Sequence, residues 1–412
     1  MLRKALVAST LLNTLAHAAP TSSNTYKLVA DYSGPSFFDG WDFFTGADPT
    51  TGYVTYQSQA SALQKNLAGF ISRPLGPNGT TTSAYIGVDY TTNLTGSTAS
   101  GRDSVRISTN ATFSGGGLFI ADINHMPIGT ACGTWPALWL LGTDGTWPQS
   151  GEIDIMEGVN LDTMNQVTLH TAEGCSVSNA STAMLGALSE TYCGPTSANS
   201  GCGVVAPSTA DLTFAGNESV IHATAGKAFN AANGAVYATL WDEDGISVYM
   251  FPHSRLPSDI RSGAPDPSSW TVKPLAKFGG DSCDFMESFY DLQLVIDTTF
   301  CGSWAGKQWN VSNVVGQEAC AVSTGYETCE AFVAAEAGAF EGTYWDVASI
   351  RAYQLTANNT YGVSASGVGK RGVGSVGEQP TVQNISAAGR GSRHGHGHGH
   401  ALRQLSARHR SA

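Results

Sequence analysis

Three acidic side chains stand close together in one short stretch of the chain: Glu152, Asp154 and Glu157. Successive side chains of a β-strand point to opposite faces, so Glu152 and Asp154 share one face while Ile153 and Ile155 take the other. Glu157 lies five residues from Glu152 and would fall on the opposite face of a regular strand. A β-bulge near Ile155 and Met156 adds one residue and brings all three acids to the same face.

Carboxyl groups that share one face repel each other, so at least one of the three keeps its proton near neutral pH. An ionised carboxylate can attack an anomeric carbon while a protonated partner gives its proton to the leaving oxygen, as glycosidic-bond cleavage requires. The alternatives are a Ca²⁺ site, which also favours oxygen ligands, and a solvated strand face. The acids alternate with isoleucines in an otherwise acid-poor region, which favours the catalytic interpretation.

Aromatic residues that could bind sugar precede the acids along the chain: Trp135, Trp139 and Trp147. The flat C–H faces of sugar rings stack on indoles, so tryptophans close to paired carboxyls indicate a carbohydrate-binding surface. Trp135 and Trp139 have the same strand parity, although Pro136 argues against a regular central strand there. Downstream, His170 stands at the end of the next expected strand, and a purely structural histidine is the alternative to a site residue.

Short runs of β-branched and aromatic residues, separated by Gly, Pro, Asn, Asp and Ser, follow one another from about residue 26 to residue 354. Each of four such runs predicts a strand: residues 104–108, 117–123, 236–241 and 292–296. Helical periodicity is weak and confined to residues 56–66 and 330–337. The pattern is typical of an all-β fold, a sandwich or a jelly roll, built as one large domain.

The first 18 residues have the layout of a signal peptide, with Arg3 and Lys4, an apolar run and a small-x-small site at residues 16–18. All 8 cysteines lie beyond it without a Cys-x-x-Cys pair, which favours disulfides over zinc and leaves their pairing open. Candidate glycan acceptors in Asn-x-Ser/Thr sequons are Asn78, Asn93, Asn110, Asn179, Asn217, Asn310, Asn358 and Asn384. We expect a secreted, extracellular glycoprotein without membrane insertion, with cell-wall association left open.

Composition narrows the remaining possibilities. A formal net charge of -12 argues against nucleic-acid binding, because phosphate neutralisation needs a basic surface. The 13% share of charged residues and the 48 glycines exclude a coiled coil and an acidic disordered protein. Gly, Ser and His dominate near the C-terminus, so we divide the chain into a signal peptide (residues 1–18), a catalytic domain (19–364) and a disordered tail (365–412).

The acidic motif at residues 151–158 resembles the Glu-x-Asp-x-x-Glu signature of glycoside hydrolase family 16, in the bulged form typical of laminarinase-like endo-β-1,3(4)-glucanases. Other segments that look like secreted fungal members are residues 124–127, 135–139, 167–171, 241–246 and 300–306. The resemblance covers roughly residues 26–354. The His-rich tail and an insertion-like stretch at residues 196–216, which contains Cys202, depart from the family pattern.

The resemblance implies a curved β-sandwich jelly roll of the concanavalin A-like kind, with an open cleft on its concave face. It makes Glu152 the nucleophile, Glu157 the general acid/base and Asp154 the helper that tunes the pair. It also matches Trp135, Trp139 and Trp147 to tryptophans of the sugar subsites, and His170 to a histidine beside the acid/base. No organic cofactor and no metal is assigned, and we expect a monomer whose partner is a β-glucan.

The leading hypothesis is therefore a secreted retaining endo-β-glucanase that hydrolyses β-1,3 or mixed β-1,3/1,4 linkages by double displacement. Cell-wall β-glucan transglycosylases, agarases and carrageenases share the signature, so transglycosylation is the main alternative. A non-catalytic β-glucan-binding protein is a further alternative, but such a protein is expected to lack one of the three acids, and all three are present.

Overall fold

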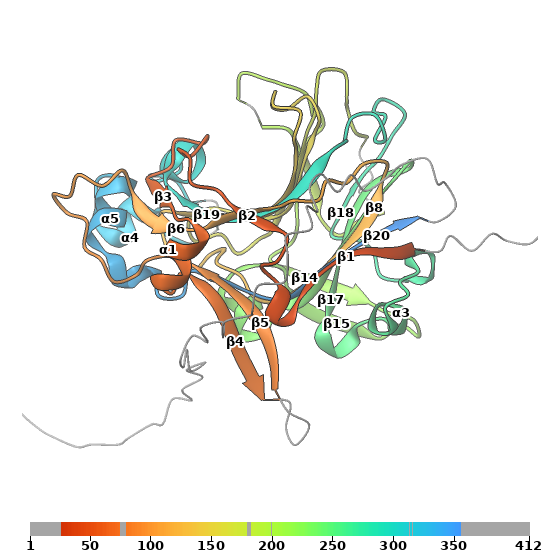
Figure 1. Cartoon of the computed structure of the whole chain (residues 1–412). Helices are drawn as coiled ribbons and strands as arrows, with labels where there is room; N and C mark the ends of the chain where they lie inside the picture. Colours follow the sequence, from red (N-terminus) through yellow and green to blue (C-terminus); the bar gives the residue numbers. More distant parts are fainter. Residues whose placement is uncertain are drawn as a thin grey trace, which may run out of the picture.

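The computed structural model describes residues 26–74, 80–178, 183–198, 200–312, 314 and 316–355, and most of its strands form two large antiparallel sheets (Figure 1). The expected signal peptide and tail lie outside these residues, as do four of the sequons: Asn78, Asn179, Asn358 and Asn384. Among the helices in the described part of the chain, none is long and apolar enough to cross a membrane.

Sheet A has the strand order β18-β17-β16-β8-β20-β5-β4, and β1 also pairs with β20. Its strands are β1 (Tyr26–Ser33), β4 (Ala68–Pro74), β5 (Thr80–Gly87), β8 (Gly117–His125), β16 (Ala235–Asp242), β17 (Gly245–Pro252), β18 (Ala276–Phe278) and β20 (Tyr344–Leu355). Sheet B has the order β12-β13-β11-β10-β9-β19-β7-β2. Its strands are β2 (Trp41–Phe43), β7 (Arg106–Thr109), β9 (Thr134–Gly142), β10 (Glu152–Glu157), β11 (Gln166–His170), β12 (Ala187–Glu190), β13 (Cys202–Val205) and β19 (Leu292–Phe300).

Smaller elements complete the chain. Two short sheets pair β3 (Val54–Tyr56) with β6 (Arg102–Ser104) and β14 (Thr209–Thr213) with β15 (Ser219–Ala223). The helices are α1 (Gln59–Gln64), α2 (Gly226–Ala231), α3 (Ser258–Ser262), α4 (Cys320–Thr324) and α5 (Cys329–Ala335). The two weak helical patterns therefore correspond to α1 and α5.

The main hydrophobic core joins the inward faces of both sheets. Ile153 and Ile155 of β10 belong to it together with Phe119 and Ile123 of β8 in sheet A. Burying one such side chain completely contributes about 1.5–3 kcal/mol. Because Ile153 and Ile155 point into this core, the acids that alternate with them point away from it, and the predicted all-β sandwich is confirmed.

One expectation from the sequence needs correction. The run at residues 104–108 is two strands, because the chain changes sheets at buried Val105: β6 pairs in parallel with β3, and β7 joins sheet B. Part of the stretch at residues 196–216, which departs from the family pattern, belongs to sheet B, since β13 lies between β11 and β12, with Cys202 opposite Leu169. The four residues of β13 are too short a run to be recognised from periodicity.

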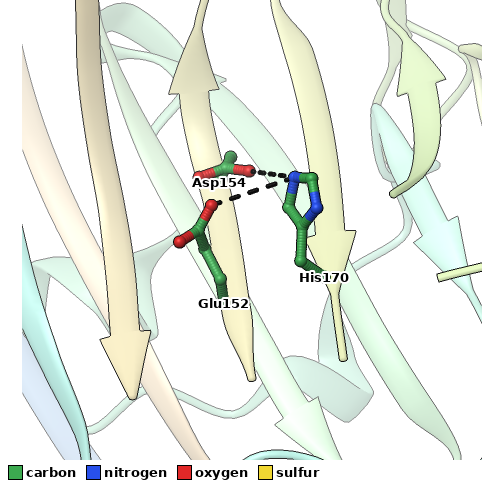
Figure 2. Close-up of side chains that lie close together, drawn as sticks. All are labelled: Glu152, Asp154 and His170. Atoms are coloured by element: carbon green, nitrogen blue, oxygen red, sulfur yellow. Dashed lines mark ion pairs between the residues drawn. The ribbon is translucent and has the colours of Figure 1, made fainter. Parts of the chain in front are cut away.

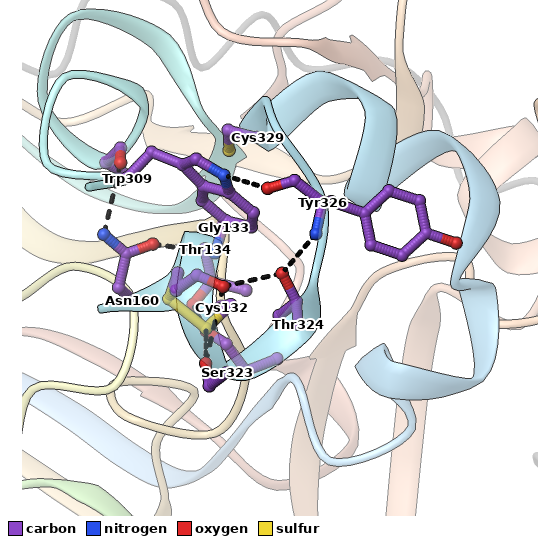
Figure 3. The surroundings of a disulfide bond; sticks show 12 residues. Cys132, Gly133, Thr134, Asn160, Trp309, Ser323, Thr324, Tyr326 and Cys329 are labelled. Carbon is purple, nitrogen blue, oxygen red and sulfur yellow. Dashed lines mark hydrogen bonds between the residues drawn. A yellow bond between two sulfur atoms is a disulfide. The ribbon is translucent and has the colours of Figure 1, made fainter. Parts of the chain in front are cut away.

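A second hydrophobic cluster stands at one end of the sandwich, where α4 and α5 lie beside β3 and β6 (Figure 1). It includes Trp309, whose indole N–H donates to the carbonyl of Tyr326 at 2.9 Å. Figure 3 shows this cluster around the disulfide between Cys132 and Cys320. The other disulfides are Cys175–Cys283, Cys193–Cys202 and Cys301–Cys329, so all 8 cysteines are paired, as the even count predicted.

This cluster fixes the ends of three central strands of sheet B. The backbone N–H of Gly133, just before β9, donates to the Asn160 side chain at 2.8 Å. The N–H of Cys301, just after β19, donates to the carbonyl of Gly133 at 2.8 Å. Asn160 follows β10 and donates from its amide to the carbonyl of Ala305 at 3.1 Å. The ends of β9, β10 and β19 are thus bonded to one another and to the disulfide-linked cluster.

Replacing Cys132 and Cys320 together by serine should lower the free energy of unfolding by about 2–4 kcal/mol. This bridge joins residues 188 apart, whereas Cys193–Cys202 joins residues only 9 apart, so the matched Cys193→Ser/Cys202→Ser variant should lose less. Urea unfolding followed by tryptophan fluorescence measures both. Equal losses in the two variants would contradict this account.

Candidate active site

A β-bulge in β10 brings the three acids to one face. Against β9, Asp154 lies opposite Trp139 but Met156 lies opposite Leu138, so β10 carries one extra residue. Against β11 the register shifts in the same place, between Asp154 and Glu157. The predicted bulge is confirmed, and it restores Glu157 to the face of the other two acids.

The bulge is held by a side chain that the sequence did not single out. Asn165 is completely buried, and its amide nitrogen donates to the carbonyl of Ile155 at 2.9 Å. Its amide oxygen accepts from the backbone N–H of Glu157 at 3.1 Å. One asparagine therefore satisfies a backbone donor and a backbone acceptor at the bulge, where the extra residue disrupts the ladder.

The start of β10 is fixed by a glycine. Gly151 has a φ of 84°, in the left-handed region that side chains other than glycine disfavour. A Cβ at this position would lie 2.6 Å from the carbonyl oxygen of Ser288 and 2.5 Å from the Phe289 ring. The chain therefore turns tightly past Ser288 and Phe289, which precede β19, and enters β10 with Glu152 as its first residue.

Each glutamate accepts a hydrogen bond from one tryptophan. The indole N–H of Trp147 donates to Glu152 Oε2 at 2.9 Å, and that of Trp135 donates to Glu157 Oε1 at 2.8 Å. Burial raises the pKa of Glu152 to about 7 and that of Glu157 to about 8, while the indole hydrogen bonds partly oppose the rise. The two carboxyls thus change charge near neutral pH, with Glu157 keeping its proton to the higher pH.

Asp154 lies between the two glutamates in the strand and is the most deeply buried of the three, with 3% of its surface exposed. Burial raises the pKa of its carboxyl well above the usual range, and the negative charges of Glu152, Glu157 and Asp297 raise it further. Asp154 therefore holds a proton when its neighbours are ionised, and a protonated carboxyl can donate a hydrogen bond to one of them.

His170 lies opposite Glu152 on the neighbouring strand β11. Its Nε2 faces two carboxyls, 3.8 Å from Glu152 Oε1 and 3.7 Å from Asp154 Oδ2 (Figure 2). Burial lowers the pKa of His170 to about 4, so the ring is neutral near pH 7. The family resemblance matches this residue to a histidine beside the acid/base; in the structure the antiparallel register places His170 opposite Glu152 and Gln166 opposite Glu157.

Within the described part of the chain, one group of side chains offers metal-binding atoms within 4.8 Å of one another: Glu152, Asp154 and His170. These are the same side chains as the acid cluster. Carboxyls with raised pKa values hold protons that a cation would have to displace, so the group is better suited to proton transfer than to metal binding.

A fourth carboxyl, which the sequence did not single out, lies on the same face. Asp297 on β19 accepts from the Trp139 indole N–H at 2.8 Å and from the Tyr56 hydroxyl at 3.2 Å. Burial raises its pKa to about 6, and the nearby Arg106 guanidinium partly offsets this rise. The available signal was an aspartate directly after the apolar run at residues 292–296, in a strand with no other acid.

The three selected tryptophans and His170 all come together with the acids. Pro136 lies within β9, contrary to the expectation from the sequence. The pairing of β9 with β10 ends at Ala137 and Glu157, so β10 has no residue opposite Pro136 that would accept a hydrogen bond from a backbone N–H there. Trp147 is 45% exposed and so offers its ring to solvent or to a ligand. Trp304 was not selected; its ring meets that of Trp135 edge to face at 5.5 Å.

Comparison with known proteins agrees with this geometry. Residues 41–353 match the family model described as the XgeA-like, catalytic GH16 domain. The chain is 41% identical over 364 residues to a probable endo-1,3(4)-β-glucanase of Neosartorya fischeri, covering 88% of this chain and 49% of the relative. It is 38% identical to an endo-1,3(4)-β-glucanase of Emericella nidulans, covering 83% of this chain and 49% of that one. The chain thus spans about half the length of these curated relatives.

Solved structures show the same likeness. Laminarinase 16A from Phanerochaete chrysosporium, described with 6-O-glucosyl-laminaritriose in its donor and acceptor sites, is 35% identical with a TM-score of 0.65, covering 80% of this chain and 100% of that one. An elongating GH family 16 β-1,3-glucosyltransferase is also 35% identical, with a TM-score of 0.64 and the same coverage. The sandwich is therefore the jelly roll of these proteins, and the chain belongs to glycoside hydrolase family 16.

Proposed function

We propose that this chain is a secreted, monomeric endo-β-glucanase that hydrolyses β-1,3 or mixed β-1,3/1,4 linkages with retention of anomeric configuration. The observation that carries the proposal is the bulged strand β10, which presents two glutamates of different pKa on one face, each hydrogen-bonded to a tryptophan. Curated relatives named endo-1,3(4)-β-glucanase support the substrate class. The four disulfides support an oxidising, extracellular location for the domain, which we place between a signal peptide and the tail.

In the first step, the protonated Glu157 carboxyl gives its proton to the glycosidic oxygen as the bond from that oxygen to C1 breaks. A carboxylate oxygen of Glu152 bonds to C1 and forms a glycosyl ester. In the second step, Glu157, now ionised, takes a proton from water while the water oxygen bonds to C1 and the ester bond breaks. Glu152 returns to its carboxylate form and Glu157 to its acid form, so protons and charges balance over the cycle.

The remaining side chains serve these two steps. Ionisation of Glu152 is favoured by the Trp147 N–H, and Asp154 can donate a hydrogen bond to the carboxylate while the nucleophile is free. Trp135, Trp139 and Trp147 are the proposed sugar-stacking surfaces, and the exposed ring of Trp147 is the most accessible of them. His170 stays neutral and can donate to or accept from a sugar hydroxyl.

Replacing Glu152 by glutamine should reduce laminarin hydrolysis by at least about 10³-fold, because the amide cannot form the glycosyl ester. Reducing-end release on laminarin and lichenan measures the loss, and Glu341→Gln, at an exposed glutamate, is the control. Unchanged turnover in Glu152→Gln would refute the assignment.

In Glu157→Ala, added azide should restore cleavage of an activated aryl β-glucoside and give the β-glycosyl azide as product. An α-glycosyl azide would exclude the retaining route.

The rate should follow a bell-shaped pH dependence, rising as Glu152 ionises and falling as Glu157 loses its proton. Trp147→Phe removes a donor to ionised Glu152, raises that pKa and moves the rising limb to higher pH by about one unit. Trp135→Phe does the same for Glu157 and moves the falling limb to higher pH. Trp147→Phe should therefore narrow the pH range of activity and Trp135→Phe should widen it. Profiles of kcat/KM against pH measure both changes.

The control for this pair is Trp270→Phe. It loses the hydrogen bond, 2.8 Å long, that the Trp270 indole N–H donates to the Asp259 carboxylate outside the site. It should leave both limbs in place. Movement of the same limb in Trp147→Phe and Trp135→Phe would contradict the assignment of one glutamate to each limb.

Transglycosylation is the second candidate, because an elongating GH family 16 β-1,3-glucosyltransferase is 35% identical to this chain. In that reaction a sugar hydroxyl replaces water in the second step. We expect hydrolysis to dominate at low laminarin-oligosaccharide concentration and longer products to appear as the concentration rises. Product sizing by chromatography over a concentration series distinguishes them, and products longer than the donor at every concentration would make transfer the main activity.

A further inference from the structure

Asp297 is a buried carboxyl on the active-site face to which the two-step mechanism gives no role. We propose that Asp297 is a positioning residue: it holds the indole of Trp139, and through it the guanidinium of Arg106, in fixed orientation beside the catalytic acids. The inference rests on the proposed glucanase function for its kinetic tests, but the contacts that carry it do not.

Both oxygens of Asp297 are engaged, and only 6% of the residue's surface is exposed. Oδ1 accepts from the Trp139 indole N–H at 2.8 Å, and Oδ2 accepts from the Tyr56 hydroxyl at 3.2 Å. The backbone carbonyl of Asp297 accepts from the Trp345 indole N–H at 3.1 Å. Both carboxyl oxygens and the backbone of Asp297 are therefore held by hydrogen bonds, as a side chain requires if it is to hold another in place.

The strand registers place Asp297 in one row with the acid/base. Glu157 pairs with Ala137, Ala137 pairs with Asp297, and Asp297 pairs with Arg106. Paired residues point to the same side of a sheet, so all four face the active site. Two strand spacings separate Asp297 from Glu157, roughly 10 Å. Only the methyl group of Ala137 lies between them in the row.

Trp139 is the link from Asp297 to the site. It lies opposite Asp154 across the β9–β10 pair, so its ring is next to the acids. The Arg106 guanidinium lies 4.9 Å from the centre of the Trp139 ring and 5.1 Å from that of Phe44. A ring that stacks on sugar is useful only if its plane is fixed, and a hydrogen bond to an ionised carboxyl fixes the indole edge.

The charge of Asp297 also acts on the catalytic acids. The groups that face it are Arg106 on β7, Trp139 on β9, Tyr56 on β3, Asp48 before β3, and the acids of β10. Its negative charge raises the pKa of Glu157 and of Glu152, after the larger effect of burial. A residue that only stabilised the fold would have neither this effect on the pH profile nor an effect on sugar binding.

Two substitutions separate the positioning effect from the charge effect. Asp297→Asn keeps an oxygen that can accept a hydrogen bond from Trp139 but removes the negative charge. KM for laminarin should therefore stay unchanged, while the pKa of Glu157 falls and the falling limb of the kcat/KM profile moves to lower pH by about 0.3–1 unit. Asp297→Ala removes the acceptor as well, and KM should rise about tenfold in addition. Asp42→Asn, at an exposed acid on edge strand β2 of the same sheet, controls for the loss of one negative charge.

A double-mutant cycle tests the link to Trp139. If Asp297 acts through the indole, Asp297→Ala should add little to the effect of Trp139→Phe on KM. Additive effects, or an Asp297→Ala variant that unfolds at the wild-type urea midpoint with unchanged KM and pH profile, would overturn the proposal. If Asp297→Ala does not fold, the Asn variant and the cycle Asp297→Asn with Trp139→Phe still decide it.

A measurement without substrate keeps this inference separate from the glucanase assignment. In ¹⁵N-labelled protein, the indole N–H resonance that disappears in Trp139→Phe should titrate with a midpoint near pH 6, and the titration should vanish in Asp297→Asn. A resonance that does not follow pH would refute the contact even in an active enzyme. Loss of laminarin hydrolysis in the wild type, with the titration intact, would refute the proposed function alone.

Discussion

The site depends on one geometric constraint: side chains in a β-strand alternate, and the three acids do not. Glu152 and Asp154 obey the alternation, and Glu157 shares their face only because β10 carries one extra residue. That extra residue exposes unpaired backbone groups, which Asn165 satisfies from a fully buried position. Everything the acids do together follows from this local irregularity and from the asparagine that makes it stable.

Burying several carboxyls on one face is costly, and the surrounding residues reduce the cost. Each of the two glutamates and Asp297 accepts an indole N–H, from Trp147, Trp135 and Trp139 respectively. An indole is a neutral donor, so it stabilises an ionised carboxyl without neutralising its charge. A lysine or arginine would neutralise that charge. The tryptophans therefore have two tasks in the proposed function: their edges bond to the acids, and the exposed face of Trp147 in particular would be available for sugar. This double use explains why indoles rather than phenyl rings surround the site.

Much of this site was predictable from the sequence, and the reasons are local. Parity within residues 151–158 gave both the shared face and the bulge, and the spacing of Trp135, Trp139 and Trp147 from the acids predicted their place. Asp297 was missed because it joins this face only through the pairing of β19 with β9, which are far apart in the chain. Asn165 was missed although it lies close in sequence, because nothing in its spacing from the acids shows that its side chain bonds to the backbone of the bulge. His170 was found, but its place opposite Glu152 could not be read from the sequence, since it is set by the register of two strands rather than by distance in sequence.

The raised pKa values near neutrality have a thermodynamic consequence for binding. A neutral polysaccharide that displaces water from Glu152, Glu157 and Asp297 makes their environment less polar and favours their protonated forms further. Under the proposed function, association with glucan would then be coupled to uptake of protons from the buffer, and affinity would fall as pH rises through the range in which these groups ionise. The enthalpy of binding correspondingly includes the ionisation heat of whatever buffer supplies those protons. For a protein with the proposed function, the proton would thus be a co-ligand of the polysaccharide.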